Sequence, residues 1–244
     1  MIYLGSALHK WRREISPSGR RLCSKNKNSP KCSMSSTLLL VPTQSEWDCF
    51  SKPFLEQIKR ANVTIELCGF GPIASAIRTT QLITRHNPDR VMLVGIAGAL
   101  APKWRIGTAI EFDDVICFGI GAGSGDGFQS AGEMGWSHWH DPKISDMLPL
   151  ATCSDPESRR LALLTCCAAS ADDQDVQLRL RKYGSAIAED MEGFSVAAAC
   201  TFTGTPLRII RGISNLAGDR NKANWRVHAA MAAVEESIQE VFPK

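Results

Sequence analysis

Short apolar segments that alternate with longer amphipathic segments are the feature that most constrains the fold of this chain. Runs at residues 37–41 (TLLLV), 90–96 and 207–213 have the length and composition of strands that are buried on both faces. Segments with helical periodicity lie between them. Strands and helices that alternate in this way form βαβ units. The pattern therefore predicts an α/β protein with a twisted, mostly parallel central sheet.

Further elements are expected from residue 37 onward. The sequence predicts strands at residues 63–68, 109–119 and 161–168, and helices at 45–60 (interrupted near Pro53), 73–86, about 190–202 and 224–241. Residues 119–149 hold five glycines between Gly119 and Gly127 and are expected to form a long irregular loop. Loops of this length commonly border a functional site or are mobile.

The N-terminal residues differ in composition from the rest of the chain. The first 33 residues contain eight Lys or Arg and one acid, Glu14. Residues 1–36 are therefore expected to be a basic, disordered extension that precedes a single domain at 37–244. Two interpretations stay open: the natural start is Met34, or the extension is a targeting arm.

Charge and cysteine content exclude several classes of function. The chain has a net charge of +3, of which +7 lies in the first 33 residues, so the remainder carries −4 and no nucleic-acid partner is expected. Nine cysteines, with no CxxC pair, indicate reduced thiols in a cytoplasmic protein without a metal site. No apolar run reaches the roughly 18 residues that span a membrane.

Glycines and polar residues follow three predicted strands, at residues 68–71 (CGFG), 95–99 (GIAGA) and 212–215 (GISN). Open α/β sheets bind ligands at the carboxyl ends of their strands. The glycines could also serve only to form tight turns. If a ligand binds there, the residues expected to contact it are Gly71, Ala97 and Gly98.

Three acids surround a methionine in residues 188–193 (AEDMEG). Glu189 and Asp190 could be ordinary partners of a helix N-terminus. Glu192 differs because the helix that it opens is otherwise apolar, and an acid beside such a run needs a partner. The two hydroxyl groups of a sugar diol would satisfy it.

Four segments together resemble the nucleoside phosphorylase and nucleosidase superfamily: GFGPIASA (69–76), GIAGAL (95–100), AEDMEGFSVAAAC (188–200) and RGISNLAGDR (211–220). The resemblance covers about residues 38–240. It implies a three-layer α/β/α fold with a mixed sheet, and cleavage of the N-glycosidic bond of a purine nucleoside. The ISN sequence, with GDRN and Trp225 after it, is most similar to the futalosine hydrolases of menaquinone biosynthesis, which release hypoxanthine.

The resemblance also assigns roles to individual residues. It implies that Glu192 holds the ribose hydroxyls and that Met191 packs against the sugar. Arg211, Arg220 and Trp225 are expected to hold the loop around position 215, and Arg220 could also contact the far end of the substrate. No metal or organic cofactor is implied. A homo-oligomer is expected.

By the same resemblance, Asn215 contacts the purine at N7 and at its six-position substituent. Nucleosidases that release adenine have Asp at this position. An amide can accept from a developing N7–H and donate to a 6-oxo group. Asn215 therefore favours hypoxanthine or guanine over adenine.

The attacking group is expected to be water. The phosphorylases of this superfamily have a phosphate-binding Arg and Ser where this chain has Leu93 and Ile96, and neither apolar side chain can bind phosphate. The resemblance implies that Glu46 is the base that activates the water, within one residue of alignment. The alternative is that Glu46 is only an acid in the first turn of a helix.

Other interpretations remain. The chain could be a different purine nucleosidase or a phosphorylase, or a non-catalytic nucleoside-binding module, although Glu46 and Glu192 argue against the last. An aromatic cluster in the long loop could form a lid over the nucleoside and is poor evidence for a metal site. Its members are Trp136, His138, Trp139 and His140, and Asp141 could be a third ligand if a metal bound there.

Overall fold

The computed structural model describes residues 35–151 and 160–242. Most of the expected N-terminal extension, residues 1–34, lies outside the described residues. Both interpretations of it stay predictions, as does a single domain at residues 37–244.

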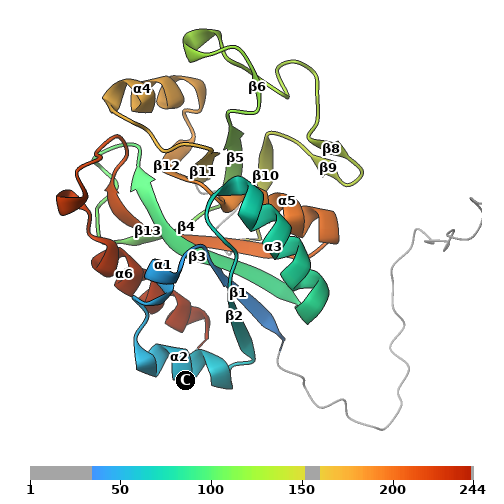
Figure 1. Cartoon of the computed structure of the whole chain (residues 1–244), viewed down its shortest axis with the longest axis vertical. Helices are drawn as coiled ribbons and strands as arrows, with labels where there is room; N and C mark the ends of the chain where they lie inside the picture. Colours follow the sequence, from blue (N-terminus) through green and yellow to red (C-terminus); the bar gives the residue numbers. More distant parts are fainter. Residues whose placement is uncertain (1–34, 152–159, 243–244) are drawn as a thin grey trace, which may run out of the picture. The chain divides into compact units, whose positions relative to one another are not determined.

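A nine-stranded sheet runs through the described residues (Figure 1). Its strands are β1 (Thr37–Val41), β2 (Val63–Leu67), β3 (Arg90–Ala99), β4 (Ala109–Glu111), β5 (Asp114–Phe118), β10 (Met147–Pro149), β11 (Ala162–Cys166), β12 (Ala186–Asp190) and β13 (Leu207–Leu216). They are ordered β10-β5-β11-β12-β3-β1-β2, with β13 beside β3 and β4 beside β13. The pairs β12–β3, β10–β5 and β13–β4 are antiparallel and the other pairs are parallel. The predicted mixed, mostly parallel sheet is confirmed.

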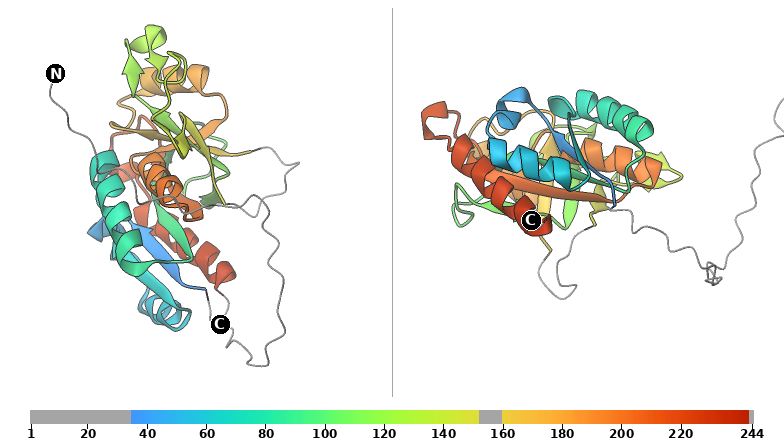
Figure 2. Two further views of the ribbon diagram at one scale, coloured as in Figure 1. Left: turned by 90° about the vertical axis from the view of Figure 1, so that its right-hand side faces the viewer. Right: turned by 90° about the horizontal axis from the view of Figure 1, so that it is seen from below.

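Helices cover both faces of this sheet. They are α1 (Gln44–Trp47), α2 (Lys52–Arg60), α3 (Gly71–His86), α4 (Asp173–Lys182), α5 (Gly193–Thr203) and α6 (Val227–Val241). One core cluster joins α2 and α6 to the sheet through Phe54 and Met231, and another joins α3 and α5 through Leu82 and Val196. α3 and α5 lie side by side in Figures 1 and 2. The three-layer α/β/α arrangement is therefore confirmed.

Two predicted helices have different boundaries in the structure. The segment at 45–60 is split into α1 and α2, because Pro53 is tolerated only in a first turn, which Ser51 caps by accepting from Phe54 N–H. α5 begins at Gly193, since residues up to Asp190 pair as β12 with β11 and β3. Glu189 and Asp190 are therefore strand residues. The interpretation as partners of a helix N-terminus holds for Asp190, which accepts from Gly193 N–H at 2.8 Å, and is wrong for Glu189, which pairs with Arg179.

Residues 109–149 are more regular than expected. The predicted strand at 109–119 is two strands, β4 and β5. The expected loop contains the hairpins β6 (Gly121–Ala122) with β7 (Gln129–Ser130) and β8 (Trp139–His140) with β9 (Lys143–Ile144), the 3₁₀ turn η1 (Gly125–Gly127) and the edge strand β10.

Among the described helices, none is long and apolar enough to cross a membrane.

Helix α4 was not predicted, because its sequence (DQDVQLRLRK) is mostly polar and shows little periodicity. Asp172 caps it by accepting from Asp175 N–H, and Val176 and Arg179 are its buried residues. Val176 packs in a third cluster with β5, β11 and β12. α4 thus covers the part of the sheet that α2 and α6 leave open.

Candidate active site

A cavity of about 670 Å³ opens where β1, β3 and β13 reach their carboxyl ends. This is the edge at which open α/β sheets bind ligands. The cavity is large enough for a substituted nucleoside. It brings together all but one of the predicted site residues, namely Glu46, Ala97, Gly98, Met191, Glu192, Asn215 and Arg220.

Glu46 is buried and lines the cavity, with 5 % of its surface exposed. Its Oε1 accepts from Ile96 N–H at 2.9 Å, and its Oε2 accepts from the Thr43 hydroxyl at 2.5 Å. Thr43 and Glu46 also form a capping box at the start of α1. Glu46 therefore caps α1 and also turns its carboxylate toward the cavity, so that its place in the helix does not exclude a role as the base.

Arg211 is fully buried on β13 and lies among acidic side chains. Its Nη2 donates to Asp190 Oδ2 at 2.5 Å and to Glu192 Oε2 at 3.3 Å, and its Nη1 donates to the Val94 carbonyl at 3.2 Å. The expectation that Arg211 holds the Asn215 loop is wrong. A register shift in β13 between Ile213 and Asn215 separates the two side chains, and Arg211 meets Asp190 at the end of β12 and Glu192 just after it.

Glu192 directly precedes α5 beside this guanidinium, and its side chain makes no capping bond to that helix. Its Oε1 accepts from Gly71 N–H at 2.9 Å. Burial raises the pKa of Glu192 to about 7; the Arg211 cation opposes the shift, and the nearby Asp190 carboxylate adds to it. Gly71 does not line the cavity, and it contacts Glu192, which does.

Gly95 lies between the side chains of Glu46 and Arg211. Its φ is +151°, and a Cβ at this position would collide with Arg211 Nη1 and lie 2.6 Å from Glu46 Oε1. Only glycine leaves room for both side chains. Three carboxylates, those of Glu46, Asp190 and Glu192, thus surround one buried cation. This excess of negative charge suits a ligand that develops positive charge.

Asn215 has its side-chain amide oriented by its neighbours. Its Oδ1 accepts from the Ser214 hydroxyl at 2.7 Å, and its Nδ2 donates to the Leu216 carbonyl at 2.7 Å. A carbonyl only accepts, so the nitrogen must face Leu216. One N–H and one lone pair of the amide remain for a ligand. Gly98 lies next to it: a Cβ there would be 3.5 Å from Asn215 Nδ2.

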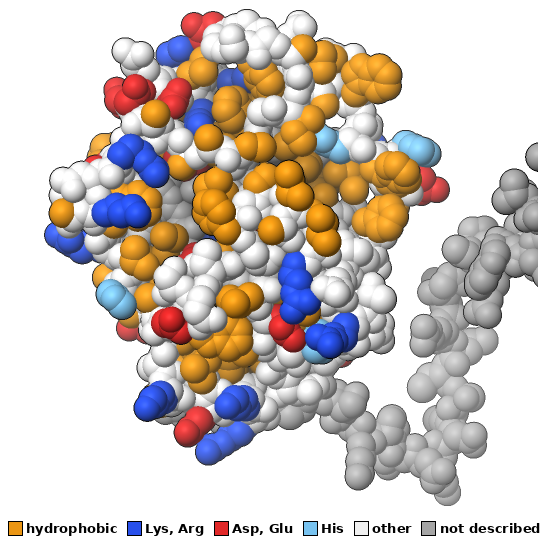
Figure 3. Space-filling model, viewed as in Figure 1, with side chains coloured by type: hydrophobic (Ala, Val, Ile, Leu, Met, Phe, Trp, Pro, Cys, Tyr) orange, Lys and Arg blue, Asp and Glu red, His pale blue; other side chains and the backbone are white. Residues whose placement is uncertain are grey.

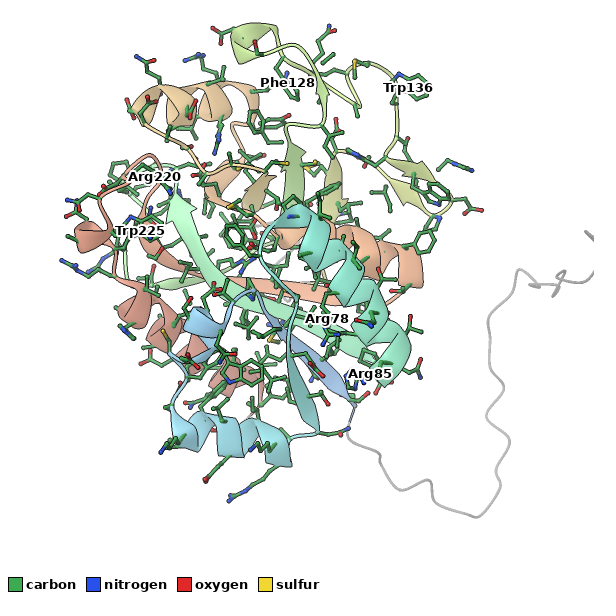
Figure 4. All side chains as sticks on the ribbon, viewed as in Figure 1. Arg78, Arg85, Phe128, Trp136, Arg220 and Trp225 are labelled. Atoms are coloured by element: carbon green, nitrogen blue, oxygen red, sulfur yellow. The ribbon has the colours of Figure 1, made fainter. Side chains whose placement is uncertain are left out.

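The segment after β13 forms another side of the cavity. Arg220 lies over the ring of Trp225, with its guanidinium carbon 5.4 Å from the ring centre (Figure 4). Trp225 Nε1 donates to the Asp219 carbonyl at 2.9 Å. These contacts hold the segment together as the sequence predicted for Arg220 and Trp225, and both residues line the cavity.

The aromatic cluster of the long loop lies away from the cavity. His138 pairs with Asp146 at 2.9 Å, Trp139 packs against Phe202, and Trp136 is largely exposed. None of the cluster lines the cavity, so the structure does not support a lid formed by it. Within residues 35–151 and 160–242, no group of His, Cys, Asp or Glu is arranged to hold a metal ion.

A family model described as the phosphorylase superfamily matches residues 43–242 of this chain. The chain belongs to the phosphorylase superfamily. The resemblance inferred from the four motifs is confirmed, and the sheet and its two helical layers are those of this superfamily.

Individual relatives point to nucleosidases. The chain is 29 % identical over 181 residues to a futalosine hydrolase of Streptomyces coelicolor, which covers 72 % of this chain and 76 % of the relative. It is 26 % identical over 184 residues to a 5′-methylthioadenosine/S-adenosylhomocysteine nucleosidase of Pseudoalteromonas translucida, with the same two coverages. The Helicobacter pylori 5′-methylthioadenosine/S-adenosylhomocysteine nucleosidase with butyl-thio-DADMe-Immucillin-A has a TM-score of 0.65 at 15 % identity, over 85 % of this chain and 99 % of that one. The predicted enzyme class, a nucleosidase that hydrolyses an N-glycosidic bond, is confirmed.

Sequence reasoning missed one part of the site. Glu189 and Ala169 also line the cavity, and Glu189 is paired with Arg179 of α4. Glu189 could have been found from its position next to Asp190. Arg179 could not, because nothing in its polar surroundings marks it as buried.

Proposed function

We propose that this nucleosidase hydrolyses a 6-oxopurine nucleoside, with futalosine as its substrate in menaquinone biosynthesis and free hypoxanthine as the product. Similarity to the Streptomyces coelicolor futalosine hydrolase supports this choice. The nucleosidases that act on methylthioadenosine are nearly as similar, so the distinction must come from the site itself.

Asn215 is the observation that carries the proposal. Its free N–H can donate to a 6-oxo group, and its free lone pair can accept from N7–H of the departing base. An unprotonated Asp in the same place would face the Leu216 carbonyl with a second acceptor at 2.7 Å. The local backbone therefore favours the amide, and the amide favours hypoxanthine over adenine.

Glu46 is the proposed base that activates water. In the proposed reaction, a water oxygen bonds to C1′ as the bond between C1′ and N9 breaks, and the electron pair of that bond leaves with the purine. Glu46 takes a proton from the attacking water, and N7 of the purine takes a proton from solvent, so that neutral hypoxanthine departs. N–H and O–H donors from Ile96 and Thr43 hold its carboxylate in position. A base held in this way contributes roughly 10²–10⁴ to the rate.

Glu192 and its neighbours act on the ribose. The carboxylate of Glu192 can accept from the sugar hydroxyls, and Met191 lies beside it at the cavity wall. The acids around Arg211 also favour the oxocarbenium-like transition state, in which the ribose carries positive charge.

Ile96 lines the cavity and Leu93 is buried. Neither can bind phosphate, which supports water as the second substrate.

One assay tests the function. Purified protein is given futalosine, inosine and methylthioadenosine, each with and without phosphate, and release of free base is followed. Futalosine should be cleaved fastest, independently of phosphate. Faster cleavage of methylthioadenosine would overturn the proposed base, and dependence on phosphate would overturn hydrolysis. Absence of any base release would favour a nucleoside-binding module.

The chain is also proposed to form a homodimer through α3. Phe70, Ile73 and Ile77 are 66 %, 77 % and 68 % exposed, and no exposed residue of α3 from Ile73 to Thr84 is charged. Figure 3 shows hydrophobic side chains gathered over the first part of this helix, with Lys or Arg side chains further along it. A helix exposed to water normally has charges along its whole outer face. An apolar patch of this kind suits a second copy of itself, because homodimer interfaces are more apolar than other contacts and are self-complementary.

A further inference from the structure

A second buried acid–arginine pair lies beside the cavity, apart from the one formed by Arg211. Arg179 Nη1 of α4 donates to Glu189 Oε2, and both side chains are at most 6 % exposed. Removing two charges from water is costly, and well-packed apolar residues often stabilise a fold as well as a buried ion pair does. The pair therefore calls for an explanation beyond stability.

The pair holds the segment that follows β11. Glu189 accepts from Ser170 twice, from its backbone N–H at 2.8 Å and from its hydroxyl at 2.7 Å. Arg179 Nη2 donates to the Ala168 carbonyl at 2.9 Å. Between these two anchored residues lies Ala169, which lines the cavity. Among the residues that the structure describes, none forms a hydrogen bond with the backbone of Ala169.

Strand register places this segment opposite Asn215. Glu189 of β12 is paired with Gly98 of β3, and Gly98 is paired with Asn215 of β13. The three residues therefore lie in one row across three adjacent strands. All three residues line the cavity, and Gly98 leaves room for the Ala217 backbone, which a Cβ would approach to 3.3 Å. A base that contacts Asn215 would lie over Gly98 with Ala169 on its other side.

Contacts of Arg179 and Lys182 with other elements hold helix α4 in place. The Arg179 guanidinium carbon lies 5.1 Å from the centre of the Phe118 ring, and Arg179 Nη1 is 3.2 Å from Cys166 Sγ. Lys182, one turn further on, bonds Glu133 at 2.7 Å and lies over Phe128. These contacts give the guanidinium one defined position, so that it can set the position of residues 168–170.

We propose that Arg179 and Glu189 are positioning residues, which hold residues 168–170 as the wall of the cavity that faces Asn215 and so determine how tightly the base is bound. The proposal rests on the proposed function in taking the base to lie at Asn215. Neither residue touches the reacting atoms. Their loss should weaken binding of base and nucleoside alike and leave the chemical step nearly unchanged.

The test compares Arg179→Met with the wild-type protein. KM and kcat are measured with the nucleoside that the wild type cleaves fastest, and Kd for free hypoxanthine and free adenine is measured by calorimetry. KM and the Kd of the preferred base should each rise about tenfold, and kcat should stay within about threefold. Arg181→Met is the matched control, because Arg181 lies on the same helix in an exposed pair with Asp126. Arg181→Met should leave KM, kcat and Kd unchanged.

Two further variants separate positioning from misfolding. Ser170→Ala removes only the hydroxyl bond to Glu189 and should raise KM about threefold in a protein with unchanged thermal midpoint. Arg179→Met combined with Glu189→Gln should bind the base better than Arg179→Met alone, because no unpaired buried carboxylate remains. A folded Ser170→Ala or Arg179→Met protein with wild-type KM and Kd would overturn the proposal. If the wild type preferred adenine, the proposed substrate would fail, and the adenine Kd would still decide the positioning role.

Discussion

Arg211 donates a 2.5 Å hydrogen bond to Asp190, although neither side chain is more than 1 % exposed. Asp190 also accepts from the Thr165 hydroxyl at 2.6 Å and from Gly193 N–H at 2.8 Å. The pair therefore joins β11, β12, β13 and the start of α5 at one point. Glu192 and Glu46 face the same guanidinium, so that the acids of the site depend on it.

Replacing Arg211 with Met should destabilise the protein strongly. Removal of Arg211 leaves Asp190 as a buried, uncompensated charge, which costs about 3–5 kcal/mol. Urea unfolding at pH 7 measures the change. Arg181→Met, which breaks an exposed pair, should leave the unfolding free energy unchanged. Equal stability of the two variants would contradict this account of Arg211.

Replacing Glu46 with Gln should separate its two roles. Gln can still bond back to Thr43 N–H in the capping box, but its amide NH2 cannot accept from Ile96 N–H, so the thermal midpoint should fall only by the cost of that lost hydrogen bond. It cannot take a proton from water, so kcat should fall by roughly 10²–10⁴. Steady-state kinetics with melting curves on the same protein measure both. Retained kcat would show that Glu46 is only a helix cap.

Replacing Asn215 with Asp should change the preferred base. The substitution removes both amide donors, and a buried group left unpaired costs about 1–3 kcal/mol, so kcat/KM for the hypoxanthine nucleoside should fall roughly 5- to 150-fold. The ratio of kcat/KM between 6-amino and 6-oxo substrates should rise. That ratio is the decisive measurement, because a structural role would lower both values by the same factor.

Glu192 should give the stability of the protein a pH dependence. Its pKa is raised from 4.5 to about 7, chiefly by burial, so the folded state keeps this proton to higher pH than the unfolded chain does. The contribution is fully present below about pH 4.5 and is lost as pH rises through about 7. At about 1.4 kcal/mol per pKa unit, the loss is about 3 kcal/mol at most. Unfolding free energies between pH 4.5 and 8 should show this decline in the wild type, and Glu192→Gln should lack it.

Replacing Ile77 with Glu should disrupt the proposed dimer. A charge in the centre of the apolar α3 face would be buried without a partner in a symmetric interface. Sedimentation velocity should show a dimer for the wild type and a monomer for Ile77→Glu. Lys59→Glu, on the exposed side of α2, is the control and should remain dimeric. A monomeric wild type would refute the proposed interface.

The sequence alone was sufficient to predict the layers of the fold and most of the cavity. Apolar runs such as residues 37–41 can only be buried strands, and their carboxyl ends meet at one edge of a parallel sheet. Glu46 and Glu192 lie shortly after the ends of β1 and β12, and Asn215 lies near the end of β13, so their meeting could be foreseen from local pattern and motif.

Only the tertiary structure decided which charges are paired. Arg211 and Asp190 are 21 residues apart, and Arg179 and Glu189 are 10 apart, and nothing local distinguishes these arginines from exposed ones such as Arg181. Their partners depend on strand register: Gly98 aligns with both Glu189 and Asn215. Register is set by long-range packing of whole strands, and the pairing of buried charges follows from it.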